Sequence, residues 1–514
     1  DFVSQGGTYC IPKDYFEQIQ AWSKLSSEEL AKLPASEGGR IARNVMERIK
    51  ELEETTGKSF RELVEPTQVK YDQVQLRRAG DTLDAKEKEI IEVDGKRREE
   101  YWKMAQASVK EGFKAAGISA VISGVVSFAA SLTDALRSRK KQLNELTKED
   151  WKEILEDSEI QIVIELIGGI EPARTYILEA LQAGKHVVTA NKDLLADYGR
   201  ELLDTAQDHG CDLMFEAAVA GGIPIIRPLK QCLAANYITE VMGIVNGTTN
   251  YILTRMTQDR MEFSEALALA SELGYAEADP TADVEGYDAG RKVAIMASIA
   301  FNSRVTFGDV FTEGITKITA ADIAYADELN MVIKLLGVAR NGESGIEAGV
   351  YPMLIPADHP LASVQDAFNA VFIHGDAVDD AMFLGRGAGR FPTASAVAGD
   401  IFEVVRNIRA GSTGRLGCTC YKSLRVKPAD ETSHRYFLRL QVEDRPGVLA
   451  GIASVFGNNN VSIAQVIQKN KHGELAELAV ITEQVLERHF KDSLLVLGEM
   501  SMIKEISTIL RVYA

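Results

Sequence analysis

The sequence predicts an α/β protein that ends in a smaller α+β module. From about residue 146 onward, β-branched apolar runs alternate with amphipathic helical runs over short connections. Residues 1–145 instead show a helix-like pattern rich in Glu, Lys and Arg. Residues 434–514 show a strand, a turn, a helix and another strand. At 514 residues the chain is too long for one ordinary hydrophobic core, so we expect several domains.

Three strands and two helices predict the parallel sheet. The first strand is Ile160–Gly169, and a helix follows from Pro172 to Gly184. The second strand is His186–Asn191 and the third is Cys211–Gly222, with a second helix between them. Strands in this order, joined by right-handed crossovers, form a partial Rossmann-like sheet. Ligands of such sheets bind beyond the carboxyl ends of the strands, which here are Gly168–Gly169, Thr189–Lys192 and Glu216–Gly222.

Charge and cysteine usage narrow the class of protein. The formal net charge of −18 and the pI near 5.1 leave no broad basic surface for a nucleic acid. The five cysteines are scattered and odd in number, which suits reduced thiols in a cytosol. We therefore expect a cytoplasmic protein that does not bind nucleic acid.

One run in the N-terminal part could be read in two ways. Residues 115–132 (AAGISAVISGVVSFAASL) carry no charge over eighteen positions, which is the lower limit for a membrane span. Serines and glycines dilute the hydrophobicity of this run. We therefore favour a buried or partner-packed helix over a membrane anchor, and the role of residues 1–145 is left open.

A charged stretch leads directly into an apolar helix. DVEGYDAGRK (Asp283–Lys292) is followed by VAIMASIAF, which has no polar face. Asp288 and Lys292 are four residues apart, so they share one face of a helix. A surface ion pair at this spacing would contribute about 0.3–0.5 kcal/mol. Charges at the mouth of a buried helix, in contrast, are costly unless they are paired or used. Spacing alone leaves both interpretations open.

Five motifs occur in the order found in homoserine dehydrogenases. They lie within about residues 146–430 and read TANKDLLA, FEAAVAGGIPII, GIVNGTTNYIL, EADPTADVEGYDAGRK and GRGAGRFPTASAVAGD. The chain therefore resembles this family. The resemblance implies an NAD- or NADP-dependent hydride transfer that interconverts L-aspartate 4-semialdehyde and L-homoserine, in threonine and methionine biosynthesis.

The resemblance also implies roles for single residues. Lys292 would donate and accept the proton, Asp288 and Glu277 would bind homoserine, and Lys192 would lie between cofactor and substrate. Reduction of an aldehyde builds negative charge on its oxygen, so a proton donor is needed beside it; a lysine near a second cation suits this task. Carboxylates suit the α-ammonium group of the substrate. The positions matching cofactor contacts are Thr189, Lys192, Gly274 and Gly389.

A structural sodium ion is a further implication of the resemblance. Its ligands would be Glu216, Val219, Gly221 and Ile223, several of them through backbone carbonyls. A glutamate followed by carbonyls at a strand end suits a hard cation. Without the resemblance, AVAGGIP would be read as a tight turn that requires glycine.

The C-terminal module resembles the ACT domain, a βαββαβ unit that binds amino acids. The turn DRPGVL (Asp444–Leu449) is its most specific feature. In homoserine dehydrogenases with this module, feedback by threonine is the usual implication, and a dimerisation module without an effector is the competing hypothesis. Both the family and ACT domains associate, so we expect a homodimer or homotetramer. The expected domains are a helical segment (1–145), a partial nucleotide-binding domain (146–222), a catalytic and dimerisation region (223–430) and the ACT domain (434–514).

One expected motif is missing. Family members begin with a G-x-G-x-x-G turn that binds the cofactor pyrophosphate at a helix N-terminus, and residues 1–159 contain no such motif. Two functions therefore remain: a homoserine dehydrogenase with an incomplete cofactor half, and a catalytically impaired amino-acid-sensing or assembly protein on the same frame. The choice between NAD and NADP is made at the second strand of a complete fold, which this sequence does not reveal.

Overall fold

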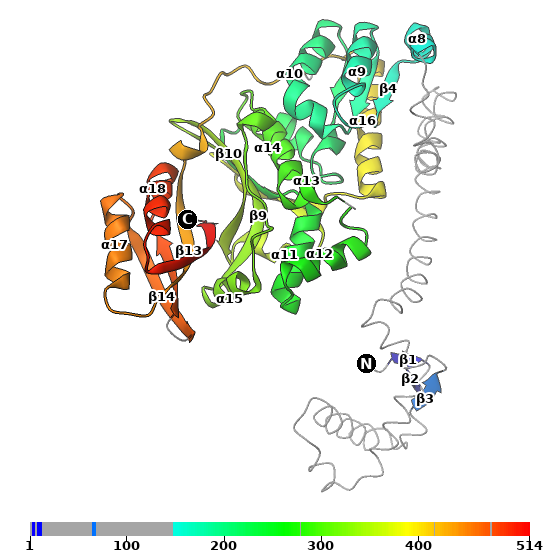
Figure 1. Cartoon of the computed structure of the whole chain (residues 1–514). Helices are drawn as coiled ribbons and strands as arrows, with labels where there is room; N and C mark the ends of the chain where they lie inside the picture. The colour runs from blue at the N-terminus through cyan, green and yellow to red at the C-terminus, as the bar shows by residue number, and fades with distance from the viewer. Residues whose placement is uncertain are drawn as a thin grey trace. The chain divides into compact units, whose positions relative to one another are not determined.

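The structure is a computed structural model that describes residues 3–5, 8–12, 64–67, 148–277, 279–415, 417–472 and 475–513 (Figure 1). The chain forms two compact units, Asp1–Leu132 and Thr133–Ala514. In the first, β2 (Thr8–Pro12) pairs antiparallel with β1 (Val3–Gln5) and parallel with β3 (Val64–Thr67). Apart from these strands, the helical pattern expected within residues 1–145, including 115–132, lies outside the described residues.

The first described element of the second unit is α8 (Lys148–Glu156), and the predicted parallel sheet follows it. The strands β4 (Ile162–Glu165), β5 (His186–Thr189) and β6 (Leu213–Met214) pair in that order. The helices α9 (Ala173–Gln182) and α10 (Lys192–Asp208) connect them, and both bury an apolar face. The third strand is much shorter than the expected Cys211–Gly222, because the chain turns into a 3₁₀ helix, η2 (Glu216–Ala218), directly after β6.

A long helix packs back on this small sheet. α16 (Arg390–Ala410) follows the GRGAG motif, and its residues Val397 and Val404 are buried against Val188 of β5 and Met214 of β6. α16 contacts β5 in the parallel sheet (Figure 1), although it begins two hundred residues later in the chain. The segment after GRGAG thus packs back on the parallel sheet.

A large sheet of eleven strands forms the rest of the unit. Its main path runs β12-β11-β7-β9-β10-β17-β13-β15-β14, with β8 beside β10 and β16 beside β13. The strands of the catalytic region are β7 (Ile238–Ile244), β8 (Phe311–Thr312), β9 (Met331–Gly342), β10 (Gly345–Pro356), β11 (Phe368–Gly375) and β12 (Asp379–Arg386). Its helices are α11 (Gly247–Asp259), α12 (Phe263–Glu272), α13 (Thr281–Val284), α14 (Tyr287–Ala300) and α15 (Ala320–Glu328).

The C-terminal module has the predicted βαββαβ order. It consists of β13 (Ser433–Glu443), α17 (Val448–Asn458), β14 (Ile463–His472), β15 (Leu475–Thr482), the short β16 (Val485–Leu486), α18 (Glu487–Gly498) and β17 (Ile503–Val512). Its own core is built on Leu438, Leu440, Ile452 and Phe456. The last strand joins the catalytic region directly: Met353 and Leu354 of β10 pair in parallel with Arg511 and Val512 of β17. The two sheets are therefore one continuous sheet.

The helix α14 occupies the centre of the unit. It contacts α10 on one side and the strands β9 and β10 on the other (Figure 1). Its residues Val293, Ala294, Met296 and Ala297 are almost fully buried. This position explains why the sequence VAIMASIAF lacks a polar face.

A membrane-spanning helix is absent from the described part of the chain, since none of its helices is both long and apolar enough.

Candidate active site

A buried carboxylate lies between two lysines from different elements. Asp288 is in the first turn of α14, and Lys192 begins α10, directly after the strand end TAN. One oxygen of Asp288 accepts a hydrogen bond from Lys192 Nζ, and the other accepts one from Lys292 Nζ at 2.6 Å. Lys292 Nζ also donates to the carbonyl of Val245 at 2.7 Å. The α10–α14 contact thus brings all three predicted catalytic residues together.

Two further polar residues complete this cluster. Asn246 Nδ2 donates to Asp288 Oδ2 at 2.9 Å and to Asp283 Oδ1 at 2.7 Å. Asn246 is held in place because its Oδ1 caps α11 by accepting from the backbone N–H of Thr249 at 2.9 Å. Both residues lie within the motifs of the family resemblance, which implied no role for either. The pair Asn246–Gly247, an N-cap residue at the start of a helix, was the signal that could have identified Asn246.

The charges of the cluster are mutually stabilising. Asp288 is 5% exposed. Burial alone would raise its pKa, but the charges of Lys292 and Lys192 outweigh this effect and hold the pKa below the usual range. For Lys192, burial would lower the pKa, but the neighbouring Asp288 raises it overall. Lys192 thus lies near Lys292 as a second cation, and both are paired with the same carboxylate, Asp288.

The pKa of Asp283 is shifted in the opposite direction from that of Asp288. Burial raises its pKa, and its hydrogen bond from Asn246 only partly offsets that effect. The cluster therefore holds two ammonium groups, one firmly ionised carboxylate and one carboxyl group whose ionisation is disfavoured. Such an arrangement can accept the ammonium group of a ligand and donate a proton to its oxygen.

The strand ends of the parallel sheet form a second polar network beside α10. Glu165 ends β4, and its Oε1 accepts from the backbone N–H groups of Ile167 and Gly168 at 2.6 and 3.1 Å. Thr189, predicted to contact the cofactor, is fully buried; its hydroxyl donates to Glu165 Oε2 at 2.6 Å. Gly168 and Gly169 both have left-handed φ angles, 79° and 72°, with open space where a Cβ would lie. This edge leaves room for a ligand to approach the backbone closely.

Three predicted residues lie on loops and are not members of the cluster. Glu277 is exposed, on the loop between α12 and α13, and makes no ion pair with the described residues. This loop is tied to the start of α11 because Thr248 Oγ1 donates to the carbonyl of Tyr275 at 2.8 Å. Gly274 on the same loop has a φ of 75° and open space beside it. Gly389, with a φ of 115°, precedes the first turn of α16.

The loop predicted to hold a sodium ion is organised by the side chain of Glu216. Glu216 is buried, and its carboxylate accepts from the backbone N–H groups of Ile225, Ile226 and Arg227 at 2.6 to 3.0 Å. These three backbone N–H donors occupy the Glu216 carboxylate. The backbone carbonyls of Val219 and Gly221 accept no backbone hydrogen bond from the described residues. The residues present therefore fit a cation held by carbonyl oxygens, with the Glu216 side chain shaping the loop.

Comparison with known proteins identifies the family. The model of the homoserine dehydrogenase family matches residues 224–402, that of the homoserine dehydrogenase NAD binding domain matches residues 104–216, and that of the ACT domain matches residues 436–492. The homoserine dehydrogenase of Bacillus subtilis is 43% identical over 379 residues, which are 73% of this chain and 88% of the relative. The chain belongs to the homoserine dehydrogenase family. This membership favours the enzymatic hypothesis over the sensing or assembly protein.

Other members agree with this assignment. The homoserine dehydrogenase of Corynebacterium glutamicum is 45% identical over 386 residues, covering 74% of this chain and 86% of the relative. Among solved structures, that from Thiobacillus denitrificans superposes with a TM-score of 0.68 at 42% identity, over 71% of this chain and 84% of that one. The Staphylococcus aureus enzyme at pH 7.5 gives a TM-score of 0.57 at 35% identity, over 71% and 85%.

The comparisons also bear on the missing turn. The NAD binding domain match begins at residue 104, before the boundary near residue 146 that the sequence texture suggested. The chain is thus a dehydrogenase with a nicotinamide dinucleotide-binding domain and an ACT domain. The sequence of residues 104–159 nevertheless contains no G-x-G-x-x-G.

Proposed function

We propose that the chain interconverts L-homoserine and L-aspartate 4-semialdehyde at the Lys192–Asp288–Lys292 cluster, with NAD or NADP as the hydride carrier. The observation that carries this proposal is the buried Asp288 carboxylate held between two lysine ammonium groups. Membership of the homoserine dehydrogenase family supplies the reaction class.

We assign the role of proton donor to Lys292. When bound, the nicotinamide cofactor supplies a hydride to the aldehyde carbon, and negative charge develops on the aldehyde oxygen. Lys292 Nζ then transfers a proton to that oxygen, which yields the hydroxyl group of homoserine. The hydrogen bonds to Val245 and Asp288 fix Nζ on the inner side of α14, so the donor is oriented before the substrate arrives.

The α-ammonium group of the substrate requires a carboxylate. We assign it to Asp288 together with Glu277, because the Glu277 loop is tied to the start of α11 beside Asn246. In this assignment Glu277 becomes ordered against the ligand, while Asp283 stays hydrogen-bonded to Asn246. Lys192 lies at the boundary between the substrate and the strand end of β5, where the nicotinamide would reach.

Replacing Glu277 with Gln tests the substrate assignment. We expect the KM for homoserine to rise about 10- to 100-fold, with kcat little changed, because one hydrogen bond between charged groups, about 1.5–3 kcal/mol, is lost. Steady-state kinetics of homoserine oxidation measures this effect. Glu272→Gln, an exposed residue at the end of α12, is the matched control. An unchanged KM in the Glu277 variant would remove this residue from the substrate site.

Cofactor contacts are proposed at three glycine-rich or strand-end positions. Gly274 and Gly389 offer exposed backbone without a side chain, and Thr189 fixes the strand end through Glu165. A cofactor contact by Thr189 would use its backbone, because its hydroxyl is already bonded. The NAD binding domain match includes residues 104–147, whose sequence lacks the usual glycine turn.

A fusion protein tests the cofactor half. A standard G-x-G-x-x-G βαβ segment placed ahead of Thr147 should bind NADPH and NADH at least about tenfold more tightly than the natural chain. The reason is that several amide–phosphate hydrogen bonds outweigh the roughly 1.4 kcal/mol that tenfold represents. Fluorescence titration of both proteins gives the two dissociation constants. Equal affinity would mean that the natural residues before Thr147 contain a phosphate site of another kind.

We further propose that the chain binds a structural sodium ion, forms an oligomer and is regulated by threonine. The sodium ion would be held by backbone carbonyls of Val219, Gly221 and Ile223, with Glu216 organising the loop.

A homodimer or homotetramer is supported by β12, an edge strand of the described sheet that exposes Met382 and Leu384. The presence of an ACT domain is the reason to propose feedback by threonine. We also propose that the protein acts in the cytoplasm.

A further inference from the structure

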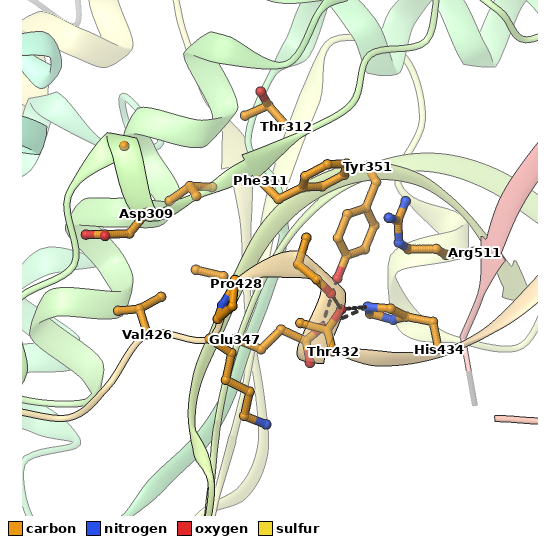
Figure 2. A pocket seen from close by; sticks show the side chains of 15 residues that line it. Asp309, Phe311, Thr312, Glu347, Tyr351, Val426, Pro428, Thr432, His434 and Arg511 are labelled. Carbon is orange, nitrogen blue, oxygen red and sulfur yellow. Dashed lines mark hydrogen bonds and ion pairs between the residues drawn. The ribbon is translucent and has the colours of Figure 1, made fainter. Parts of the chain in front are cut away.

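Two cavities outside the proposed active site differ in how their charged side chains are paired. One, of about 580 Å³, lies beside Glu347 and Arg511 (Figure 2). These buried charges have partners, since Arg340 Nη1 lies 3.9 Å from Glu347 Oε1 and Glu313 Oε2 lies 2.7 Å from Arg511 Nη1. The other cavity, of about 220 Å³, is lined by Lys230. This lysine makes no ion pair with a carboxylate of the described residues.

Lys230 brings its cation to a pair of thiols. It belongs to the π-helix η3 (Pro228–Cys232), and its Nζ donates to the carbonyl of Gly417 at 3.3 Å. Cys418 follows Gly417 directly and lines the same cavity. Burial lowers the pKa of Lys230, and the thiols of Cys418 and Cys420 act against that effect. An ammonium group in this position is stabilised when a nearby thiol ionises.

The two thiols are arranged for unequal roles. The backbone N–H of Cys420 donates to Cys418 Sγ at 3.5 Å. A hydrogen bond from the Cys420 thiol, this N–H group and the charge of Lys230 together lower the pKa of Cys418, although burial opposes them. The hydrogen bond to Cys418 and burial raise the pKa of Cys420. Cys418 is thus the thiol that ionises, and Cys420 is the one that keeps its proton.

The surroundings favour redox chemistry over metal binding. Within the described part of the chain, Cys418 and Cys420 belong to no group of three His, Cys, Asp or Glu side chains that could hold a metal ion. Thr419, between them, lines the same cavity, and its buried hydroxyl has no hydrogen-bond partner among the described residues. That hydroxyl is available to an oxygen atom placed on the Cys418 sulfur.

We propose that Cys418 and Cys420 form a reversible oxidation site for hydrogen peroxide. In the first step the Cys418 thiolate attacks one peroxide oxygen, so that an S–O bond forms and the O–O bond breaks. The hydroxide that leaves takes up the proton that the Cys418 thiol released and becomes water. In the second step the Cys420 sulfur attacks the Cys418 sulfur, so that the S–S bond forms and the S–O bond breaks. The hydroxyl group leaves as water with the Cys420 proton. Two thiols are thereby oxidised to one disulfide, and the peroxide is reduced to water.

Oxidation would change one contact of the helix α14. In the reduced chain Cys420 Sγ donates to the carbonyl of Ser298 in α14 at 3.6 Å. A disulfide sulfur has no proton to donate, so this hydrogen bond is lost. A disulfide that encloses one residue constrains the unfolded chain very little and adds little stability, which suits a bond that is made and broken. The inference does not rest on the proposed dehydrogenase function, because the state of the thiols is measured directly.

Mass spectrometry of the full chain tests the site. The chain is reduced, freed of reductant, exposed to excess hydrogen peroxide and alkylated with N-ethylmaleimide. Trypsin releases both cysteines in one peptide, residues 416–422. We expect this peptide to carry two alkyl groups before oxidation and none after it, with a mass lower than that of the unalkylated dithiol peptide by two hydrogens. Dithiothreitol should restore the labelling. Cys232, which is exposed, is the control thiol and should keep its alkyl group.

Variants assign the two roles. Cys420→Ser should stop at the sulfenic acid, which dimedone traps on Cys418, whereas Cys418→Ser should trap at least about tenfold less dimedone on Cys420. Lys230→Met should slow disulfide formation at least about threefold, because the thiolate loses its cation. The exposed control Lys317→Met should not change the rate. Thermal melts check that each variant is folded.

Three results would overturn the inference. The first is a peptide 416–422 that keeps both alkyl groups after treatment with excess peroxide. The second is a disulfide between chains, seen as a dimer on a non-reducing gel, in place of the bond within the peptide. The third is equal trapping of dimedone in the two folded serine variants.

Discussion

Replacing Lys292 with Met should lower kcat for the reduction of aspartate semialdehyde by about 10²- to 10⁴-fold, the usual contribution of a positioned general acid. Methionine keeps most of the side-chain volume in this buried site but has no proton to give. Lys292 Nζ is the ammonium group fixed on α14 by Val245 and Asp288. Steady-state rates at saturating aldehyde and cofactor measure the effect.

A control separates lost chemistry from lost structure. Lys317→Met removes an exposed lysine outside the cluster and should leave kcat unchanged. The folded state of the Lys292 variant is checked by its circular dichroism and by cofactor binding, both of which should be retained. If kcat of the folded Lys292 variant stays within threefold of the wild type, another group donates the proton.

Replacing Asp288 with Asn should reduce both stability and activity. The amide leaves the buried Lys292 ammonium without its carboxylate, and breaking a buried pair in this way costs about 3–5 kcal/mol of unfolding free energy. Lys192 is partly exposed, so its share of that loss is screened by solvent. The loss of a charged acceptor for the substrate should also lower kcat/KM by at least about 10- to 100-fold.

Urea denaturation at neutral pH and homoserine kinetics measure the two effects of Asp288→Asn. Because the pKa of Asp288 is depressed in the fold, its contribution to stability is present at neutral pH. That contribution is lost in the wild type as the pH falls below about 4, the value for an unfolded aspartate. The difference in stability between wild type and variant should therefore shrink in acid. A difference that stays constant from neutral pH to strong acid would show that Asp288 is not the ionised centre of the cluster.

The alternation of strands and helices was enough to predict the parallel sheet, but not the length of its third strand. Cys211–Gly222 is apolar throughout, and a short buried run does not reveal by periodicity where a strand ends. The structure ends β6 at Met214 because the Glu216 carboxylate binds the backbone N–H groups of residues 225–227 and draws the chain into a turn. Ala220 and Gly221 complete that turn with φ angles of 56° and 53°. These are long-range and conformational facts that no local pattern contains.

The local part of the candidate site could be predicted from the sequence, but its long-range contacts could not. The spacing of Asp288 and Lys292 on one helical face follows from the sequence, and the buried helix behind them excludes a simple surface pair. Lys192 comes from an element 96 positions away, and only the family resemblance connected it to them. Asn246 and Asp283 were missed because their shared hydrogen bonds arise from the packing of α11 against α13. Glu277 remains a prediction, since no hydrogen bond or ion pair joins it to the cluster among the described residues.

Isotope transfer shows whether hydride passes between homoserine and a nicotinamide at this cluster. Homoserine deuterated at its hydroxyl-bearing carbon is incubated with the full chain and saturating NADP⁺ or NAD⁺, and the reduced cofactor is analysed by mass spectrometry. The account predicts that the reduced cofactor gains one deuterium per turnover with the wild-type chain, and that this transfer falls at least about a hundredfold in the folded Lys292→Met variant. Unlabelled or absent reduced cofactor with the wild-type chain, or equal transfer in both proteins, would contradict it.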